Sequence, residues 1–307
     1  MTSPTDRTPT VDVIIPTYNQ AEFLHDALQS VVAQDFSNWN ALVVNNMSTD
    51  HTKAVVDNFK DPRISILDFS NRGIIAASRN LGIFRSGATY IAFLDSDDWW
   101  YPHKLRRCIE HLEAGFDVVC HAEEWKRGAS SRYVSYGPSS RAGYRALLLG
   151  GNCLSTSAVM GRTSMFQQVG GFSTNPEFAT AEDYDLWLRL AERRYNFTFL
   201  DETLGVFRVH SMSASSSVER NCRAEMSVVR EHFSRLENAS SLMIRKRKAR
   251  SHYGAARAHH RNGNLKSAWL HYGKAFGLWP VSLRILAGTF LLLLSVAGHK
   301  RSSGPRP

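Results

Sequence analysis

The chain has 307 residues, of which 43% are hydrophobic and 21% are charged. This globular composition excludes a fully disordered chain, a collagen-like repeat and a small disulfide-stabilised fold. The net charge of +9 is uneven, because the segment from Arg235 to Pro307 holds fourteen basic residues and one acidic residue, Glu237, whereas the preceding part is mildly acidic.

Such a charge distribution suggests a catalytic domain followed by a region that meets anionic surfaces. A nucleic-acid partner is not expected, because the basic segment lacks a recognition motif and an aromatic–basic platform. Residues 1–10 have no apolar core of a secretory signal, and we expect them to form a flexible N-terminus.

The four cysteines are Cys108, Cys120, Cys153 and Cys222. None belongs to a C-x-x-C pair, so the spacing gives little support to zinc binding or to thioredoxin-like chemistry. We expect buried thiols in a reducing compartment, which favours a cytoplasmic location.

Strands and helices alternate in the first hundred residues. The apolar patterns predict strands over 11–15, 39–44, 64–67 and 90–94, separated by helices over 21–34, 49–59 and 73–85. Regular alternation with short connections predicts an α/β fold with a Rossmann-like, mainly parallel sheet flanked by helices. In such a sheet the polar residues that follow the strands meet along one edge, where ligands bind.

The pattern is less regular after Pro102. We expect strands over 118–122, 156–160, 197–200 and 204–209, a helix over 184–193, and a helical C-terminal region from 218 onward. Residues 253–280 resemble one tetratricopeptide-type helix hairpin. The expected domains are therefore a catalytic domain over 11–217 and a basic helical appendage over 218–307.

The tetrapeptide Asp95-Ser96-Asp97-Asp98 follows a fully apolar strand. Three carboxylates in four positions repel one another, and a bound cation relieves this repulsion. Mg²⁺ and Mn²⁺ take oxygen ligands and leave coordination positions for substrate phosphates. The alternative is a solvated turn that caps the helix beginning near Pro102.

Seven motifs resemble those of the family 2 glycosyltransferases, which have the nucleotide-sugar-binding GT-A fold. In chain order they are Val13-Ile14-Ile15-Pro16-Thr17-Tyr18-Asn19, Ser48-Thr49-Asp50, Asn71-x-Gly73, Ala77-Ser78-Arg79-Asn80-x-Gly82, the acidic tetrapeptide, Gly170-Gly171-Phe172 with Glu182-Asp183-Tyr184-Asp185-Leu186-Trp187, and Arg208-Val209-His210. The resemblance covers residues 11–217. It implies an inverting transferase that uses a nucleotide sugar and Mn²⁺ or Mg²⁺ and assembles surface polysaccharide or lipid-linked glycans.

The resemblance also implies roles for individual residues. Asp183 would deprotonate the acceptor hydroxyl, and Glu182 would help to place the acceptor or the donor. Asp95, Asp97 and His210 would hold the metal, although a lone histidine is more often a structural hydrogen-bonding residue. The nucleotide would contact residues at or near the strand ends, and Arg79 on the helix before the acidic strand end. The former are Pro16, Thr17, Tyr18, Asn19, Asn45, Asn71, Asp95 and Ser96.

Several residues have two interpretations. Arg79 either pairs with the diphosphate or with an acid of the site, or it is a surface cation. Trp99 and Trp187 are candidates for contact with a sugar, whereas for Trp99 the alternative is packing on the helix near Pro102. Arg208 and the serines Ser211, Ser213 and Ser215 form either a lid over the phosphates or a solvated loop.

One position departs from the family pattern. Many members have two acids after the second strand, where this chain has Asn45 and Asn46. An asparagine oxygen still accepts a hydrogen bond from a base N–H, so UDP, dTDP and GDP sugars are all candidate donors. The departure also keeps a second hypothesis open, a catalytically weakened nucleotide-sugar-binding scaffold or sensor. A dehydrogenase is disfavoured because no G-x-G-x-x-G follows a strand.

The last apolar run, 285–298, is short for a membrane span. It follows Trp279 and the basic run Arg245-Lys246-Arg247-Lys248-Ala249-Arg250, and His299-Lys300-Arg301 closes it. This pattern favours an interfacial helix over 281–298 on an anionic leaflet, at the inner face of the cell membrane. Alternatively, Leu283, Leu286, Phe290 and Leu294 pack on the helix hairpin, or the segment spans the membrane.

Overall fold

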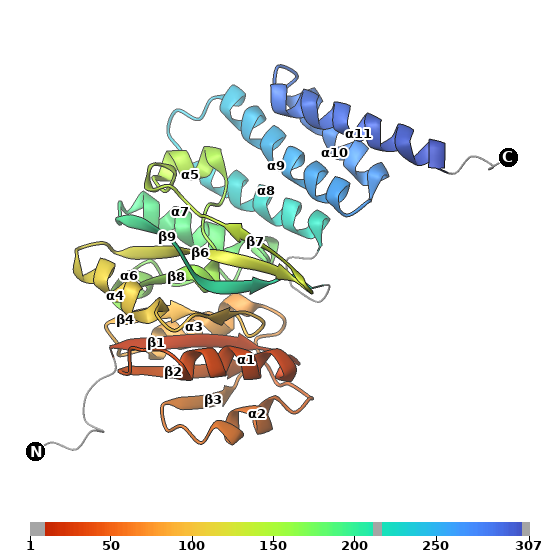
Figure 1. Ribbon diagram of the computed structural model, residues 1–307. Coiled ribbons are helices and arrows are strands. Elements are labelled where there is room, and N and C mark those ends of the chain that lie inside the picture. Colours follow the sequence, from red (N-terminus) through yellow and green to blue (C-terminus); the bar gives the residue numbers. More distant parts are fainter. Residues whose placement is uncertain (1–9, 211–216, 303–307) are drawn as a thin grey trace, which may run out of the picture. The chain divides into compact units, whose positions relative to one another are not determined.

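The computed structural model describes residues 10–210 and 217–302 of the chain. It divides the chain into two compact units, shown in Figure 1. The first contains Met1–Leu147 and Asn152–Ser213, and the second contains Leu148–Gly151 and Ala214–Pro307. The division after residue 213 lies close to the expected boundary at 217, but it places Leu148–Gly151 with the helical unit. The expected flexible N-terminus lies almost wholly outside the described residues.

The first four strands form a parallel sheet in the first unit. They are β1 (Val11–Thr17), β2 (Trp39–Asn45), β3 (Ile64–Asp68) and β4 (Tyr90–Phe93), and the helices between them are α1 (Ala21–Val32), α2 (Thr52–Phe59) and α3 (Ile75–Arg85). Each of these elements lies within a few residues of its predicted range. Local hydrophobic periodicity identified them because the buried side chains repeat at the period of the element.

The second half of the sheet is mixed. Its strands are β5 (Trp99–Trp100), β6 (Val118–Arg127), β7 (Ser130–Val134), β8 (Val159–Arg162) and β9 (Phe197–Arg208). The strand order is β3-β2-β1-β4-β8-β6-β9-β5, with β7 paired to β6. Strand β8 runs antiparallel to β4 and β6, while β6 and β9 are parallel. The expected parallel arrangement therefore holds only for part of the sheet.

The helices of this half are α4 (Lys104–Glu113), α5 (Tyr144–Gly150), α6 (Thr163–Gln168) and α7 (Glu182–Glu192), with short 3₁₀ helices at Ser139–Arg141, Thr156–Ala158 and Pro176–Phe178. Two expectations need correction. The segment 156–160 begins as a 3₁₀ helix and becomes a strand only at Val159. The two short strands expected over 197–209 are one strand, β9, whose pairing with β6 shifts register in the middle.

The core of the first unit lies between the sheet and its helices. The apolar face of α1, including Leu24, Leu28 and Val31, is fully buried against the strands. Helix α3 lies so close to β1 that a side chain at Gly82 would approach Ile14 to 2.7 Å. Only glycine therefore fits at position 82, and the close contact packs α3 directly on β1.

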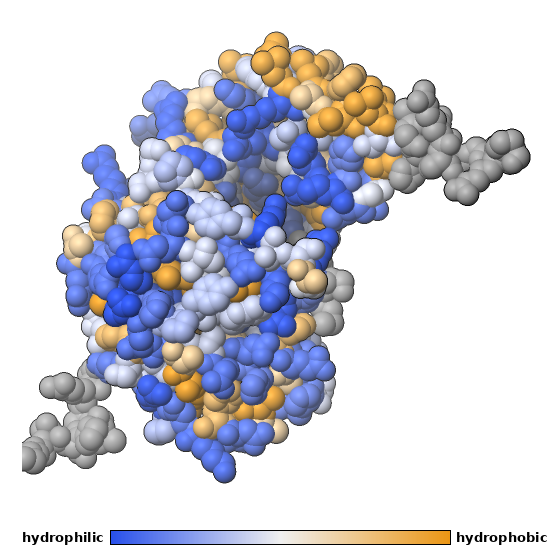
Figure 2. Space-filling model, in the orientation of Figure 1, coloured by the Kyte–Doolittle hydropathy of each residue, from blue (hydrophilic) through white to orange (hydrophobic). Residues whose placement is uncertain are grey.

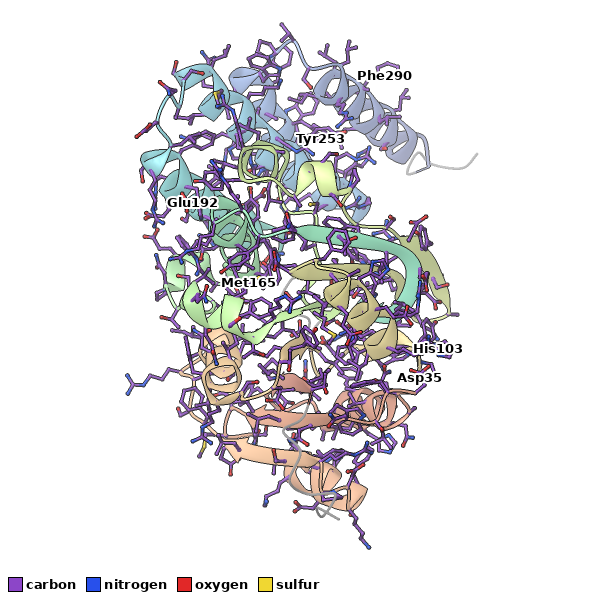
Figure 3. All side chains as sticks on the ribbon, turned by 90° about the vertical axis from the view of Figure 1, so that its left-hand side faces the viewer. Asp35, His103, Met165, Glu192, Tyr253 and Phe290 are labelled. Atoms are coloured by element: carbon purple, nitrogen blue, oxygen red, sulfur yellow. The ribbon has the colours of Figure 1, made fainter. Side chains whose placement is uncertain are left out.

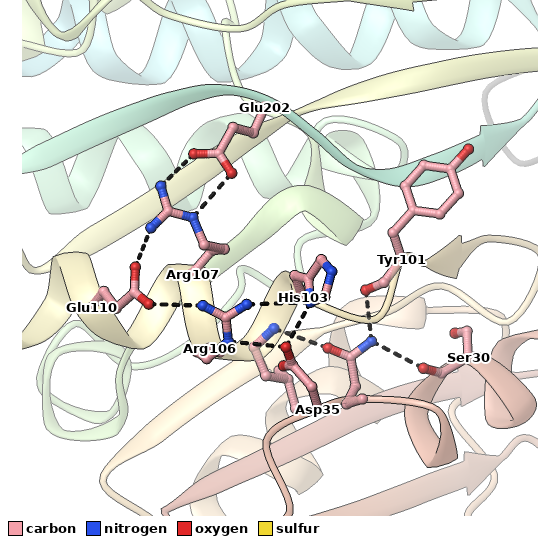
Figure 4. A network of polar contacts seen from close by, with 10 residues as sticks. Ser30, Asp35, Tyr101, His103, Arg106, Arg107, Glu110 and Glu202 are labelled. Atoms are coloured by element: carbon pink, nitrogen blue, oxygen red, sulfur yellow. Dashed lines mark hydrogen bonds and ion pairs between the residues drawn. The ribbon is translucent and has the colours of Figure 1, made fainter.

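A buried glutamine, Gln34, holds the loop that follows the acidic tetrapeptide by contacts to Ser30 and Tyr101, which are both labelled in Figure 4. The Gln34 side-chain amide donates hydrogen bonds to the carbonyls of Ser30 (3.0 Å) and Tyr101 (2.9 Å), and its oxygen accepts one from the Leu105 N–H (2.9 Å). An outer layer of ion pairs joins Arg106 to Asp35 at 2.9 Å. Because those pairs are exposed, they contribute little stability, and Gln34 is the stronger link between α1 and α4.

The second unit is helical, as expected from residue 218 onward. It contains α8 (Val218–Arg235), α9 (Ser241–Arg261), α10 (Leu265–Leu278) and α11 (Leu283–Ser302). Helices α9 and α10 form a hairpin around Ala256, Ala268 and Tyr272. None of the helices within the described residues is long and apolar enough to span a membrane.

Arg247 explains why Leu148–Gly151 belongs to the second unit. Its side chain is 1% exposed, and its Nε donates a hydrogen bond to the Leu148 carbonyl at 2.6 Å. The same guanidinium pairs with Glu225 of α8 at 2.5 Å. Arg247 is therefore an internal cross-link and not one of the surface cations expected from the basic run.

Candidate functional site

Three parallel strands end side by side in the first unit. The register pairs Thr17 at the end of β1 with Asn45 at the end of β2, and Asn45 with Asp68 at the end of β3. The Thr17 hydroxyl is buried and has no hydrogen-bond partner among the described residues. Polar groups thus gather at the carboxyl edge of the sheet, as the sequence predicted.

Asn45 is held on both sides by neighbouring residues. Its Nδ2 donates a 2.6 Å hydrogen bond to Asp68 Oδ1, and its Oδ1 accepts one of 3.1 Å from the Ser48 N–H. Asn45 is buried, whereas Asp68 is exposed. The acceptor-only group at this edge is therefore the carboxylate of Asp68. Sequence reasoning missed it, although its place as the last residue of a parallel strand was the signal that could have found it.

The loops after β1 and β2 are bound to each other. Asn19 lies in the left-handed region with a φ of 50°. Its side-chain oxygen accepts a 2.8 Å hydrogen bond from the Thr49 N–H, and its own N–H donates to Ser48 Oγ at 2.9 Å. Pro16 is buried, while Tyr18 is 55% exposed. Of these residues, Tyr18 has the ring most available to a ligand.

Asn71 shapes the loop that precedes α3. Its side chain donates to Ser78 Oγ at 2.8 Å and accepts from the Gly73 N–H at 2.8 Å. Its backbone N–H donates to Asn46 Oδ1 at 2.9 Å. Gly73 has a φ of 80°, which favours glycine. Asn71 is 8% exposed, so it supports the loop and offers little surface to a nucleotide.

Arg79 joins two acids that are far apart in the sequence. One guanidinium nitrogen pairs with Asp95 Oδ1 at 2.6 Å and another pairs with Glu182 Oε1 at 2.9 Å. Burial disfavours the charge on Arg79, but the two carboxylates more than compensate and raise the pKa of Arg79. Arg79 is 4% exposed and is thus a partner of the site's acids, not a surface cation.

Asp97 lies beside His210. The His210 Nε2 is 2.8 Å from Asp97 Oδ2, and its other ring nitrogen, Nδ1, is buried without a partner among the described residues. Burial and the charge of Asp95 raise the pKa of Asp97, and His210 acts in the opposite direction. One nitrogen and several carboxylate oxygens form a donor set that suits Mn²⁺ or Mg²⁺.

Two of the three expected metal ligands come together directly. Asp97 and His210 are in contact, whereas Asp95 is bound by Arg79. In the part of the chain that the structure describes, three ligand atoms lie within 4.8 Å of one another only in the second unit. The expected set of Asp95, Asp97 and His210 is therefore not a compact triad.

Asp98, the last residue of the acidic tetrapeptide, anchors this loop to neighbouring elements. Its two oxygens accept hydrogen bonds from Ser157 Oγ (2.6 Å) and from the Arg208 N–H (2.8 Å). Ser157 Oγ also accepts one from the Asp95 N–H at 3.1 Å. Burial, followed by the charge of Asp97, holds the pKa of Asp98 well above its usual range.

Ser96 lies in the acidic tetrapeptide, and Trp99 begins the short strand β5 that follows it. Ser96 is 3% exposed and its hydroxyl donates to Gln20 Oε1. The Trp99 ring is partly exposed and lies 4.6 Å from the Arg208 guanidinium and 5.6 Å from Lys126 Nζ. Trp99 thus packs against cations, and part of its ring is accessible to a ligand.

The Arg208 side chain is held by contacts within the first unit. It donates to the Asp97 carbonyl at 3.0 Å and pairs with Asp26 at 2.7 Å. These contacts tie the Arg208 side chain to Asp97 and Asp26, which does not favour its expected role in a lid over the phosphates. Ser211, Ser213 and Ser215 lie outside the described residues.

Asp183 lies at the first turn of α7. Its oxygens accept hydrogen bonds from the Asn152 side chain at 3.1 Å and from the Tyr184 N–H at 2.7 Å. Burial and the neighbouring Glu182 carboxylate raise the pKa of Asp183 to about 7. A carboxylate with a pKa near neutrality that is still partly accessible is suited to general-base catalysis. Asn152, on the loop before β8, is a contact that the sequence did not reveal.

The other residues expected on α7 have structural roles. Both Glu182 oxygens are occupied, one by Arg79 and one by the Thr180 N–H at 2.7 Å. Trp187 is completely buried and its ring packs edge-on against Phe172 at 6.2 Å. The expectation that Trp187 contacts a sugar is therefore corrected, because its face of α7 is turned into the core.

Comparisons with known proteins agree with these features. Residues 12–170 match the family described as glycosyl transferase family 2. The chain is 27% identical over 231 residues to TuaG of Bacillus subtilis (strain 168), a glycosyltransferase whose name refers to teichuronic acid biosynthesis, and the match covers 73% of this chain and 88% of TuaG. It is 24% identical over 207 residues to WfaP of Escherichia coli, named as a UDP-Glc:alpha-D-GlcNAc-diphosphoundecaprenol beta-1,3-glucosyltransferase, and the match covers 67% of this chain and 80% of WfaP.

Among solved structures, the mannosyltransferase PcManGT from Pyrobaculum calidifontis in complex with GDP-Man and Mn²⁺ superposes with a TM-score of 0.62. The match covers 95% of this chain and 81% of that chain at 18% sequence identity. At this identity the likeness shows a shared fold.

Proposed function

Since the chain belongs to glycosyl transferase family 2 and has the GT-A fold expected from its sequence, we propose that it transfers a sugar from a nucleoside-diphosphate sugar to an acceptor hydroxyl with inversion at the anomeric carbon. The observation that carries the proposal is the environment of the Asp183 carboxyl group. Asp183 has a pKa of about 7 and lies one residue from Glu182, which Arg79 links to Asp95. The proposed base is thus next to a network of buried ion pairs that reaches the acidic tetrapeptide.

In this proposal Asp183 removes the proton of the acceptor hydroxyl as that oxygen attacks the anomeric carbon. One direct displacement inverts the configuration, so no covalent sugar–enzyme bond is needed. Arg79 and Glu182 are positioning residues, because the buried ion pairs fix Asp95 relative to α7. Asn152 orients the Asp183 carboxyl.

The donor would lie along the carboxyl edge of the sheet. Tyr18 has an exposed ring, and the buried Thr17 hydroxyl at this edge has no hydrogen-bond partner within residues 10–210 and 217–302. Asp97 and His210 would hold Mn²⁺ or Mg²⁺, with Asp95 as a further oxygen donor. The metal would neutralise the charge of the departing diphosphate. The names of WfaP and PcManGT contain a UDP sugar and GDP-Man, so both nucleotide classes remain candidates.

The proposed pathway is surface-polysaccharide or lipid-linked glycan assembly at the inner face of the cell membrane. The name of TuaG refers to teichuronic acid biosynthesis, and the name of WfaP contains a diphosphoundecaprenol-linked sugar. A cytoplasmic location agrees with four free, buried cysteines. Hexosyl transfer would fit both WfaP, named a glucosyltransferase, and PcManGT, named a mannosyltransferase.

The proposal can be tested by measuring release of nucleoside diphosphate from UDP, dTDP and GDP sugars with Mn²⁺ and candidate lipid-linked acceptors. Asp183→Asn should lose roughly 10²–10⁴-fold in turnover and still bind the donor. Glu192→Gln is the matched control, because Glu192 is exposed at the other end of α7, as Figure 3 shows. Near-normal turnover in Asp183→Asn would mean that another residue is the base. Donor binding without turnover in the wild type would favour the scaffold hypothesis.

The metal assignment needs its own measurement. We expect Asp97→Asn to weaken Mn²⁺-dependent binding of the preferred nucleoside diphosphate in isothermal titration. Asp57→Asn is the control, since Asp57 lies exposed on α2 and pairs with Lys53. Unchanged Mn²⁺ dependence in Asp97→Asn would remove Asp97 from the metal site.

Helix α11 supports a proposal of membrane contact. Ile285 and Leu292 are buried against the hairpin, and a side chain at Gly288 would approach the Tyr272 ring to 2.6 Å. The opposite face is exposed and apolar: Leu283 is 82%, Leu286 45%, Phe290 61% and Leu294 53% exposed. Figure 2 shows this hydrophobic surface, and Figure 3 labels Phe290. The alternative that these four residues pack on the hairpin is therefore not supported.

Exposed cations accompany this face within the second unit. Arg245, Lys246 and Arg250 of α9 are exposed, and Lys246 Nζ lies 5.6 Å from the Trp279 ring. Each cation near an anionic surface contributes roughly 1 kcal/mol to binding. The side chains of His299, Lys300 and Arg301 lie outside the described residues.

Sedimentation with vesicles tests the membrane proposal. The protein should sediment with anionic vesicles, and the bound fraction should fall as salt rises. Phe290→Glu with Leu294→Glu should abolish sedimentation, whereas Phe84→Glu, at an equally exposed position on α3, should not. Sedimentation that is unaffected by the double substitution would exclude α11 as the contact.

A further inference from the structure

The second unit contains a cluster of metal-binding residue types that the proposed transferase chemistry does not use. This histidine cluster consists of Glu219 and Cys222 on α8, His252 and His259 on α9, and His271 on α10. Glu219 and Cys222 lie one turn apart on α8, and His252 and His259 lie two turns apart on α9. Three helices drawn next to one another in Figure 1 therefore contribute to one cluster.

His271 is the centre of the cluster. Its Nδ1 lies 3.1 Å from His252 Nδ1, and its Nε2 lies 2.9 Å from Glu219 Oε1. His259 Nε2 lies 3.2 Å from the same Glu219 oxygen. The ligand atoms of Cys222, His252 and His271 all lie within 4.8 Å of one another.

The contact with Glu219 determines the protonation of His271. A carboxylate only accepts hydrogen bonds, so the Nε2 of His271 must carry a hydrogen. In the neutral ring, Nδ1 then has a free lone pair, which points toward His252 Nδ1. Histidines that bind metals commonly donate their other N–H to a carboxylate in this way. Glu219 thus prepares His271 to act as a ligand through Nδ1.

The cluster is largely buried, and its exposed edge lies at Glu219 and His252. His271 is 2% exposed and Cys222 is 6% exposed, while His252 is half-buried. The only hydrogen bond found for the Cys222 Sγ among the described residues is a long one of 3.9 Å, to the Ser251 carbonyl. Cysteine binds a metal as its thiolate, so binding of a cation would displace the Cys222 proton.

A further histidine, His259, shares the carboxylate of the cluster. His259 is 7% exposed, and its Nδ1 has no hydrogen-bond partner among the described residues. Its Nε2 shares the Glu219 carboxylate with His271, and the two rings lie 5.5 Å apart. The cluster therefore places three buried or half-buried imidazoles near one carboxylate and one thiol.

We propose that Cys222, His252 and His271 bind a Zn²⁺ ion, with Glu219 as the hydrogen-bond acceptor that orients His271. One sulfur and two nitrogen donors suit zinc, whereas Mg²⁺ and Mn²⁺ prefer oxygen. Zn–N bonds of about 2.0–2.1 Å in a tetrahedral site place two nitrogens about 3.3 Å apart, close to the observed 3.1 Å. Water takes the fourth position.

The ion would cross-link α8, α9 and α10. Because it binds only the folded helices, it raises the melting temperature of the chain, and the stabilisation grows with the logarithm of its concentration relative to its dissociation constant. None of its ligands belongs to the acidic site of the first unit, so the two metal sites can be tested separately. The missing C-x-x-C spacing is no obstacle, because each ligand comes from a different helix.

The experiment uses the full chain after treatment with a chelator. Zn²⁺ titration should give one tight equivalent and a higher melting temperature. Replacement by Co²⁺ should produce thiolate-to-cobalt charge-transfer absorption and the visible bands of a tetrahedral ion. Cys222→Ser should remove the charge-transfer band, and His271→Gln should abolish tight binding of one equivalent.

Two matched variants serve as controls. Cys153→Ser replaces another buried cysteine, and His260→Gln replaces a neighbouring histidine of α9 that bonds to Ser295. Both should bind one equivalent with unchanged Co²⁺ spectra. Glu219→Gln should weaken binding by roughly 10–100-fold without changing the stoichiometry.

A third variant, His252→Gln, tests the site with less risk of misfolding, because His252 is only half-buried. Circular dichroism of the metal-free variant shows whether it is folded. A folded His252→Gln variant that no longer binds Zn²⁺ supports the site. The absence of a tight equivalent in the wild type would overturn the proposal. Equal Zn²⁺ affinity in the wild type and in His252→Gln would overturn it too, leaving a hydrogen-bonded Glu–His–His contact that needs no metal.

Discussion

Replacing Asn45 by aspartate is expected to destabilise the protein above neutral pH. In the native structure Asn45 Nδ2 donates a 2.6 Å hydrogen bond to Asp68 Oδ1. The substitution removes this donor and places a second carboxylate against the first. Since an acid at this position would match the pattern of many family members, only the contact with Asp68 makes the change unfavourable.

The magnitude follows from the distance and the exposure. Two unit charges 2.6 Å apart repel by roughly 1.6 kcal/mol in water and by roughly 6 kcal/mol at an effective dielectric constant of 20. Asp68 is exposed, so solvent screening favours the lower value. Adding about 1 kcal/mol for the lost hydrogen bond gives an expected loss of roughly 2–3 kcal/mol.

Urea unfolding at pH 8 and pH 5 measures this loss. One of the paired carboxyls in the variant will have a raised pKa in the folded state, so the folded state binds more protons than the unfolded state. The deficit in stability should therefore shrink as the pH falls. Asn45→Asp with Asp68→Asn exchanges donor and acceptor, and it should recover most of the stability at pH 8.

An Asn45→Asp variant as stable as the wild type at pH 8 would refute this reasoning. So would a double variant that shows no recovery, because the two positions would then be energetically independent. Binding of UDP, dTDP and GDP to the exchanged pair also tests whether this edge contributes to base selection.

The remaining predictions concern other charged groups of the first unit. The rate of transfer should fall as the pH drops below about 7, because the Asp183 carboxylate becomes protonated; a rate independent of pH between 5 and 8 would contradict its role as base. Arg79→Met should cost about 3–5 kcal/mol in denaturant unfolding, since it leaves two acids without their buried partner, and adding Glu182→Gln should restore part of the loss. Lys104 is fully buried above the Trp100 ring, its Nζ has no hydrogen-bond partner among the described residues, and burial lowers its pKa to about 8. Lys104→Met should therefore raise the melting temperature below pH 8, with a gain that disappears toward pH 10.5, where the unfolded lysine also loses its proton; a lower melting temperature at pH 7 would show that the cation–π contact is the larger effect.

The local patterns of the sequence were sufficient for the first four strands and their helices. Residues such as Leu24, Leu28 and Val31 repeat at the period of a helix and are buried on one face in the structure. The same logic placed Asp95–Asp98 at the end of a buried strand. The short strand β7 and the helices α5 and α6 were not predicted, because their composition carries no strong periodicity.

What the sequence could not determine is which residues become partners. Arg79 could have been a surface cation, Arg247 was counted with the surface charge, and Trp187 was assigned to a sugar. The structure buries all three, because the face that each presents depends on elements far away in the chain.

Composition, periodicity and motif order by themselves determined the α/β architecture, the acidic edge and the basic helical C-terminal region. These properties are local, since each depends on residues within one strand or helix. Only the tertiary structure decided that Asn45 is held by Asp68, and that Cys222, His252 and His271 meet from three helices. The physical reason is that side chains distant in sequence come within bonding distance only after the packing of whole elements fixes their relative positions.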